Sequence, residues 1–173
     1  MVRLRAYRAS DIPRLVELAN NKNVSRYLIY TFPFPYTEQD AEWWVSTGAR
    51  ENGAVTKVIE FHDLFVGSAG IQPQSGWKDH SGEIGYWVGE SYWGNGIATE
   101  ALRQMTQIGF EELGLRKLFA PVLSPNVGSM KVLEKCGYER EGVLKAEVHK
   151  DDTYYDIHHF AINCIKHSAE PDA

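Results

Sequence analysis

The 173-residue chain is 43% hydrophobic and 24% charged, and 18 basic against 23 acidic residues give a net charge of −5. This length predicts one domain with its own core, and the acidic balance argues against a dedicated nucleic-acid-binding protein, which would show a basic stripe. No run approaches the ~18 apolar residues of a membrane span, and the first residues lack a secretory signal. The two cysteines are too few for a disulfide scaffold, so we expect a cytoplasmic protein.

The chain shows no internal repeat, linker or low-complexity stretch. We expect a single domain over residues 1–166, followed by a polar tail over 167–173 with the composition of a disordered terminus. Aromatic residues are frequent, with 5 Trp and 9 Tyr. Composition alone leaves open whether they form an ordinary core or line a ligand-binding groove.

The N-terminal half predicts a strand, two helices and a hairpin. Alternating apolar residues predict a strand over 2–7, and Ser10 or Asp11 caps a helix with Pro13 in its first turn. Thr37 caps a second helix. Two strand patterns then follow, joined by a short turn at His62-Asp63, and their ranges are 55–61 and 64–71.

The C-terminal half begins with a strand over 83–88 and a glycine-rich loop over 89–96. The remaining elements are a helix from Ile97 to Gly114, a strand over 117–123, a helix from Asn126 to Cys136, and strands over 139–149 and 153–165. Strands at both ends and one strand-helix-strand crossover between them indicate a mixed α+β sheet.

The loop from Gly89 to Glu100 carries the clearest chemical signal. A glycine-rich turn that opens a helix presents free backbone N–H groups and the positive end of the helix dipole, so it can bind phosphate; the alternative is a turn that only connects two elements. A nucleoside-triphosphate loop is excluded because Asn95-Gly96 stands where Lys-Ser/Thr is needed. A dinucleotide fingerprint is excluded because Thr99 replaces its third glycine.

Residues 92–101, YWGNGIATEA, resemble the acetyl-CoA pyrophosphate loop of the GNAT acetyltransferases, and more narrowly the RimJ/RimL-type branch that acetylates ribosomal-protein N-termini. Three further segments agree in order, and they lie at 36–41, 83–88 and 126–138. The sequence departs from the broad loop pattern at Trp93, which stands in place of Gln or Arg. It also has Glu134 where many members place a tyrosine that acts as general acid.

The resemblance implies a GNAT-like fold with a central, mostly antiparallel sheet of about seven strands, a splay between the fourth and fifth strands, and about four flanking helices. It implies transfer of an acetyl group from acetyl-CoA to a primary amine, above all a protein N-terminal α-amine, by direct attack in a ternary complex. Acetylation of a small amine such as an antibiotic or polyamine is one alternative, and a catalytically silent acyl-CoA-binding module is another. A homodimer is also implied.

The resemblance further assigns site residues. Those that contact the cofactor would be Tyr86, Trp87, Val88, Trp93, Gly94, Asn95, Gly96, Ile97, Ala98, Thr99, Asn126 and Ser129. Ser129 would lie near the sulfur, although it could instead be a helix residue that faces solvent. Glu83 is the candidate base, with a salt-bridged strand-end carboxylate as the alternative.

Aromatic residues between the first two predicted helices could form core or line the acceptor entrance, and they are Tyr27, Tyr30, Phe32, Phe34 and Tyr36. No metal is expected. The adjacent His158 and His159 face opposite sides of a strand, and the other histidines show no ligand spacing.

Overall fold

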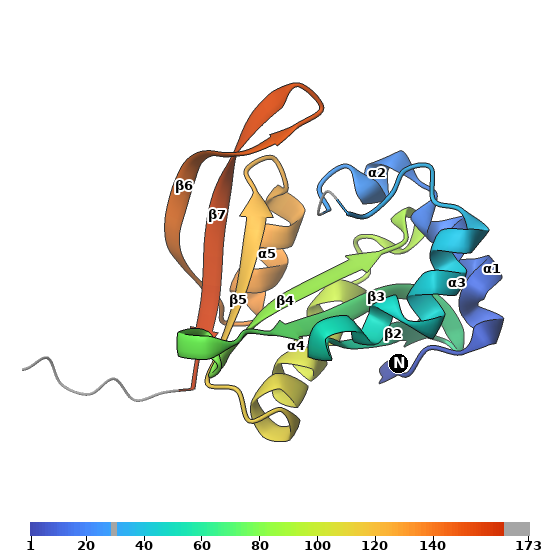
Figure 1. Ribbon diagram of the computed structural model, residues 1–173, viewed down its shortest axis with the longest axis horizontal. Coiled ribbons are helices and arrows are strands. Elements are labelled where there is room, and N and C mark those ends of the chain that lie inside the picture. The colour runs from blue at the N-terminus through green and yellow to red at the C-terminus, as the bar shows by residue number, and fades with distance from the viewer. Residues whose placement is uncertain (29–30, 165–173) are drawn as a thin grey trace, which may run out of the picture.

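The computed structural model describes residues 1–28 and 31–164. They form one seven-stranded sheet in the order β1-β2-β3-β4-β5-β7-β6 (Figure 1). The strands are β1 (Val2–Arg5), β2 (Val55–Phe61), β3 (Leu64–Pro73), β4 (Ser81–Val88), β5 (Lys117–Leu123), β6 (Glu139–Lys150) and β7 (Thr153–Asn163). Every neighbouring pair is antiparallel except β4 and β5. The expected mixed, mostly antiparallel sheet is confirmed.

The described residues contain five α-helices, one more than expected. They are α1 (Ile12–Ala19), α2 (Lys22–Ser25), α3 (Glu38–Ser46), α4 (Ile97–Gln107) and α5 (Val127–Lys135). Short 3-10 turns occupy Ala9–Asp11, Gly48–Gly53, Gly76–Lys78 and Glu90–Tyr92, and a π-helical turn over Ile108–Glu112 extends α4. The additional helix is α2, a single turn whose N-cap, Asn21, accepts the backbone N–H groups of Asn23 and Val24.

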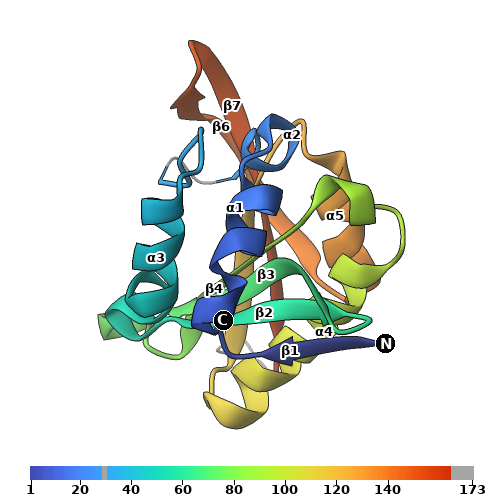
Figure 2. The same cartoon turned by 90° about the vertical axis from the view of Figure 1, so that its right-hand side faces the viewer.

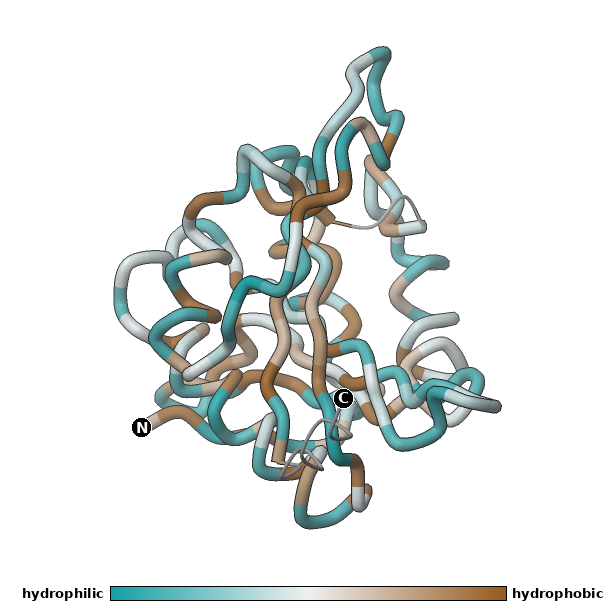
Figure 3. Tube along the Cα trace, turned by 90° about the vertical axis from the view of Figure 1, so that its left-hand side faces the viewer, coloured by the Kyte–Doolittle hydropathy of each residue, from teal (hydrophilic) through white to brown (hydrophobic). Residues whose placement is uncertain are grey.

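Two layers of apolar side chains cover the two faces of the sheet. Because successive residues of a strand point to opposite faces, Val58 and Phe65 join the core beneath α1 and α3, whereas Ile59 and Val66 join the core shared with α4 and α5. Figure 2 shows α1 and α3 on one side of β1–β3 and α4 on the other. Figure 3 shows the apolar colour on strands in the middle of the sheet, whereas the tip of the β6–β7 hairpin is hydrophilic.

The sheet opens between β4 and β5. These parallel strands pair only at Ser81–Lys117, Gly82–Leu118 and Glu83–Phe119, and beyond Glu83 they run apart (Figure 1). This is the expected splay, and Glu83 marks its origin. All remaining residues of β4 therefore lack a neighbouring strand on that side.

Several predicted boundaries need correction. The first strand ends at Arg5 rather than residue 7, because the Arg8 N–H donates to Asp11 Oδ2 (2.8 Å) and turns the chain toward α1. The fourth strand begins at Ser81, two residues before the predicted start. The last strand is described to Asn163, and residue 165, the end of the domain at 166 and the polar tail over 167–173 lie outside the described residues. Within the described ranges, no helix is long and apolar enough to cross a membrane.

Candidate active site

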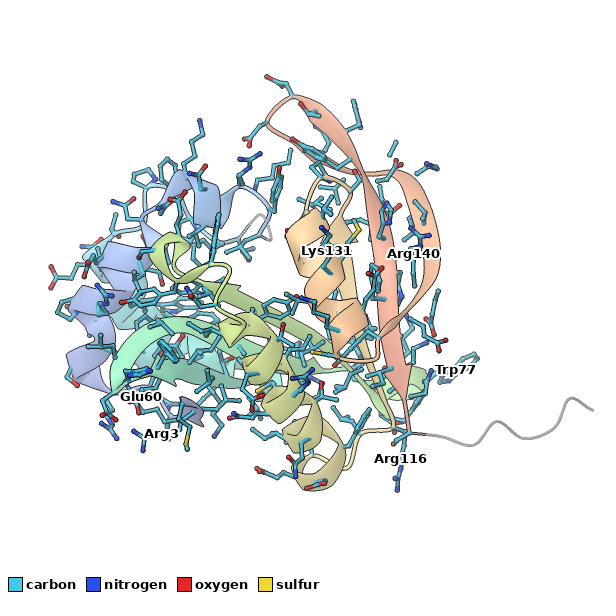
Figure 4. The ribbon with its side chains drawn as sticks, turned by 180° about the vertical axis from the view of Figure 1, so that it is seen from behind. Arg3, Glu60, Trp77, Arg116, Lys131 and Arg140 are labelled. Atoms are coloured by element: carbon cyan, nitrogen blue, oxygen red, sulfur yellow. The ribbon has the colours of Figure 1, made fainter. Side chains whose placement is uncertain are left out.

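A cavity of about 750 Å³ lies where the splay meets α4, α5 and the α2 segment, which we define as residues 21–28. All predicted cofactor residues except Asn95 line it: Tyr86, Trp87, Val88, Trp93, Gly94, Gly96, Ile97, Ala98, Thr99, Asn126 and Ser129. The structure thus brings together residues from β4, the loop after it and two helices. Lys131 and Lys135 of α5 add positive charge to the wall, and Figure 4 marks Lys131.

The loop before α4 has the conformation of an anion-binding turn. Gly94 and Gly96 have φ angles of 78° and 74°, in the left-handed region that glycine adopts without steric cost. The first helical bond runs from the Glu100 N–H to the Gly96 carbonyl (3.1 Å). Among the described hydrogen bonds, none uses the N–H groups of residues 94–99. A row of free donors at a helix N-terminus suits a pyrophosphate.

Trp93 anchors this loop to the end of β4. Its indole Nε1 donates to the Val88 carbonyl at 2.6 Å, and the amide of Asn95 closes the turn by donating to the carbonyls of Tyr92 (3.2 Å) and Trp93 (3.1 Å). The departure from the broad loop pattern therefore has a structural role of its own. Asn95 contributes by shaping the backbone rather than by lining the cavity.

The open edge of β4 presents unpaired backbone groups to the cavity. The Gly89 N–H donates to the Val66 carbonyl (2.8 Å), and the register places Gly67 opposite Val88. In an antiparallel ladder, residues next to a hydrogen-bonded pair turn their N–H and C=O groups away from the partner strand. Val88 and Tyr86 consequently direct theirs into the splay, where the Val88 carbonyl accepts from Trp93 Nε1 and the Val88 N–H and both Tyr86 groups have no partner among the described residues. An extended ligand that carries amides can pair with this edge as an additional strand would.

Two hydroxyl groups meet across the splay. Tyr86 Oη lies 2.9 Å from Ser129 Oγ and 3.2 Å from the Ser129 carbonyl oxygen. Asn126 caps α5 by accepting the Ser129 N–H (3.2 Å), which fixes the start of the helix. Burial raises the pKa of Tyr86 above its ordinary value, so the phenol is neutral. Ser129 therefore faces the cavity and not bulk solvent.

Glu83 lies at the origin of the splay but does not line the cavity. It is half-buried, and among the described residues it has neither a hydrogen-bond nor an ion-pair partner, so the salt-bridged alternative finds no support. Burial raises the pKa of this carboxyl. Alternation along β4 places Glu83 on the face of Trp87, opposite Tyr86. Glu134 is exposed and lies outside the cavity lining.

The aromatic residues between α1 and α3 lie in different environments. Tyr36 is core, and Phe32 packs on Tyr36 (centroids 5.2 Å apart) and edge-on against Trp87 (5.9 Å). Tyr27 lines the cavity, whereas Phe34 is exposed. Tyr30 lies outside the described residues. Among the described members of this group, Tyr27 at the end of the α2 segment is therefore the one that lines the cavity. Sequence reasoning missed α2 because four helical residues show no periodicity.

Other reactive side chains lie apart from the cavity or in packing roles. The imidazole of His159 stacks on Phe119 (5.2 Å), and that of His149 stacks on Tyr154 (4.6 Å). Among residues 1–28 and 31–164, no three His, Cys, Asp or Glu side chains gather as metal ligands. Cys136 donates to the Thr99 carbonyl (3.4 Å), and burial raises the pKa of its thiol. It is therefore a poor nucleophile at neutral pH.

A splayed sheet whose open strand edge leads to a glycine-rich loop with free backbone N–H groups fits a ligand that combines amides with a pyrophosphate, as coenzyme A does. The chain belongs to the GNAT acetyltransferases, because the family described as "Acetyltransferase (GNAT) domain" matches residues 2–139. It is an acetyl-CoA-dependent N-acetyltransferase that acts on an amine.

Known proteins of similar sequence or structure agree with this assignment. The chain is 28% identical over 160 residues to the "Uncharacterized N-acetyltransferase YnaD" of Bacillus subtilis, covering 92% of this chain and 91% of that protein. RimJ of Mycobacterium smegmatis, solved in complex with CoA-disulfide, is similar with a TM-score of 0.84 and 28% identity over 94% of this chain and 82% of RimJ. Spermidine N-acetyltransferase of Vibrio cholerae, solved with CoA and spermine, shares the fold (TM-score 0.80, 23% identity, 94% and 95% covered).

Proposed function

We propose that this protein acetylates the α-amine of a protein or peptide N-terminus by direct attack on acetyl-CoA in a ternary complex. The observation that carries the proposal is the joint presence, in one cavity, of the open β4 edge, the free N–H groups before α4 and the Ser129 hydroxyl. The similarity to RimJ at 28% identity supports the choice of acceptor. A small amine such as a polyamine is the alternative acceptor.

Different residues along the cavity would contact different parts of acetyl-CoA. The N–H groups of residues 94–99 would hold the pyrophosphate, with Lys131 and Lys135 as nearby positive charges. The edge of β4 at Tyr86 and Val88 would pair with the pantetheine amides, and Asn126 would contact the same arm. The Val88 N–H would then lie beside the thioester carbonyl, where one such donor contributes ~10² to 10³ in rate.

The proton transfers need only modest assistance. An α-amine with a pKa of ~8 is about one-tenth neutral at pH 7, whereas a lysine amine near 10.4 is neutral about once in 2,500 molecules. A carboxylate with a raised pKa, such as Glu83, is a weak base that suffices for the α-amine. As the nitrogen bonds to the acetyl carbon and the C–S bond breaks, Glu83 accepts the amine proton through water. Ser129 passes a proton to the leaving thiolate and regains one from water, and Glu83 returns the proton of the amine to water.

The first experiment is titration calorimetry with acetyl-CoA on the wild type and on Gly96→Glu. The variant places a carboxylate and a strained backbone within the row of donors, so we expect at least a hundredfold loss of affinity. Gly76→Glu is the matched control, because Gly76 also has a positive φ (62°) with open space at its Cβ position, but it lies outside the cavity. Equal binding by wild type and Gly96→Glu would contradict the proposed site.

The second experiment measures free thiol release with a panel of peptides, polyamines and lysine analogues. The proposal requires peptides with a free N-terminus to have the highest kcat/KM, and the same peptides with blocked N-termini and no lysine to be inactive. A polyamine with the highest kcat/KM would establish the alternative. Light scattering of the purified protein would test the implied homodimer.

A further inference from the structure

The α2 segment crosses the open end of the splay. At the other end, β4 and β5 hold each other through the pairs at Ser81–Glu83, and beyond them the two halves of the sheet diverge. Figures 1 and 2 both show α2 and the β6–β7 hairpin at the same end of the molecule. The segment thus lies between the strand before the phosphate loop and the strands that follow α5.

On one side, the α2 segment is tied to the loop after β4. The side-chain amides of Asn21 and Asn23 donate to the two carboxylate oxygens of Glu90, at 2.7 and 2.8 Å. Both oxygens of Glu90 are therefore engaged by the same short segment. Since hydrogen bonds to an ionised acceptor are the stronger kind, this side of the segment is well held.

On the other side, a single lysine ties the segment to the hairpin. Lys150 ends β6, and its Nζ donates to the carbonyl oxygens of Ser25 (3.1 Å), Arg26 (3.0 Å) and Leu28 (3.2 Å). An ammonium group has three donors, and all three are used here. A cation is also the favoured partner for the free carbonyl groups at the end of a helical turn.

Through these two ties, the α2 segment links the two sides of the splay at its open end. Among the described residues, Lys150 makes the only charged link between the segment and the β6–β7 hairpin. The inner side of the α2 segment lines the cavity through Asn23, Val24, Arg26, Tyr27 and Leu28. The position of this wall therefore depends on Lys150, although Lys150 does not line the cavity itself.

We propose that Lys150 is a positioning residue that determines acceptor specificity. By holding the α2 segment across the splay, it keeps the opening narrow, so that amines on a slender chain end reach the acetyl group and amines beside a bulky substituent do not. The proposal rests on the proposed N-acetyltransferase acceptor site and adds to it the size class of the acceptor. Lys150 acts through the segment and takes no part in the chemical step.

The direct test is hydrogen exchange of the full-length protein, which requires no acceptor. The backbone N–H groups of Ser25, Arg26 and Leu28 are hydrogen-bonded within the segment, so their exchange reports its opening. Lys150→Met should speed their exchange roughly tenfold. Lys145→Met is the matched control, because Lys145 lies on the same hairpin but pairs within it, to Asp156 (2.8 Å). Equal exchange in Lys150→Met and the wild type would overturn the proposal.

The second test compares peptides that differ only in a small (Gly) or bulky (Trp) first residue. The wild type should favour the small residue, Lys150→Met should reduce this kcat/KM ratio about tenfold, and Lys145→Met should leave it unchanged. The kcat/KM ratio of Lys150→Arg should lie between those of the wild type and Lys150→Met, since a planar guanidinium cannot direct three donors from one atom. A ratio unchanged in Lys150→Met would overturn the assignment of specificity. A wild type that acetylates neither peptide would contradict the proposed function, whereas the exchange result would still decide the role of Lys150 in holding the wall.

Discussion

The hydroxyl of Tyr86 lies 2.9 Å from Ser129 Oγ, and this contact joins β4 to α5 across the splay. Tyr86 Oη can donate to Ser129 Oγ, which leaves the Ser129 hydroxyl proton free to point into the cavity. It can instead donate to the Ser129 carbonyl oxygen at 3.2 Å and accept from Oγ. Because burial keeps the phenol neutral, both arrangements are available over the physiological pH range. The Ser129 hydroxyl proton is free to point into the cavity in the first arrangement and points to Tyr86 Oη in the second.

Replacement of Ser129 by Ala should lower kcat by ~10 to 10² if this hydroxyl protonates the thiolate. Tyr86→Phe should lower kcat by a smaller factor, because Ser129 remains but loses its partner. The KM for acetyl-CoA should change little in both variants. Steady-state thiol release measures these effects. A double variant no slower than Ser129→Ala alone would show that the two hydroxyls act together, and an unchanged kcat in Ser129→Ala would exclude its role.

Trp93→Phe should weaken acetyl-CoA binding about fivefold. The variant keeps an aromatic ring but removes the donor to the Val88 carbonyl, and a lost hydrogen bond of this kind costs ~1 kcal/mol. The loop before α4 would then be less well ordered. Calorimetry with acetyl-CoA measures the change. Trp77→Phe is the control, because Trp77 is fully exposed and distant from the cavity, and it should bind as the wild type does.

Glu83→Gln should raise the stability of the free protein at pH 7. Burial raises the pKa of Glu83 in the folded state, so its protonated form is favoured there, and stability falls as the pH rises through that pKa. Glutamine has no carboxyl group to ionise, so the variant does not lose this stability. The difference should vanish near pH 4, where the carboxyl is protonated in the folded protein and largely so in the unfolded chain. Urea unfolding at both pH values tests this, and a variant less stable than the wild type at pH 7 would contradict it.

The same variant should lose more activity with a lysine acceptor than with an N-terminal α-amine. Lysine needs more help from a base, because its neutral form is about 250 times rarer at pH 7. We expect a loss of roughly tenfold or less for the α-amine. The ratio of kcat/KM values for a peptide and its N-terminally blocked, lysine-bearing counterpart provides the measurement. Equal losses for the two acceptors would argue against Glu83 as the base.

Local patterns were sufficient to predict most of the fold. Alternation in β2 and β3 reports which residues face each core layer, since side chains of a strand point alternately to opposite faces. The glycines at 94 and 96 and the helix that follows them identify the phosphate loop, because free N–H groups at a helix start are a local property. The features that were missed are short or irregular. Helix α2 has too few residues to show a helical period, and the first strand ends early because the Arg8 N–H donates to the Asp11 side chain and turns the chain.

Residues close together in the chain were enough to identify the class of this protein, its strand order, four of its five described α-helices and the glycine-rich loop, because each of these depends on neighbouring residues. Which side chains meet is a property of the folded chain as a whole. Tyr86 and Ser129 are 43 residues apart, and Lys150 is 125 residues from Ser25. Such contacts depend on the register of the strands and the angle of the splay. Both result from packing of the two cores and from backbone pairing across the whole sheet, which no local pattern encodes.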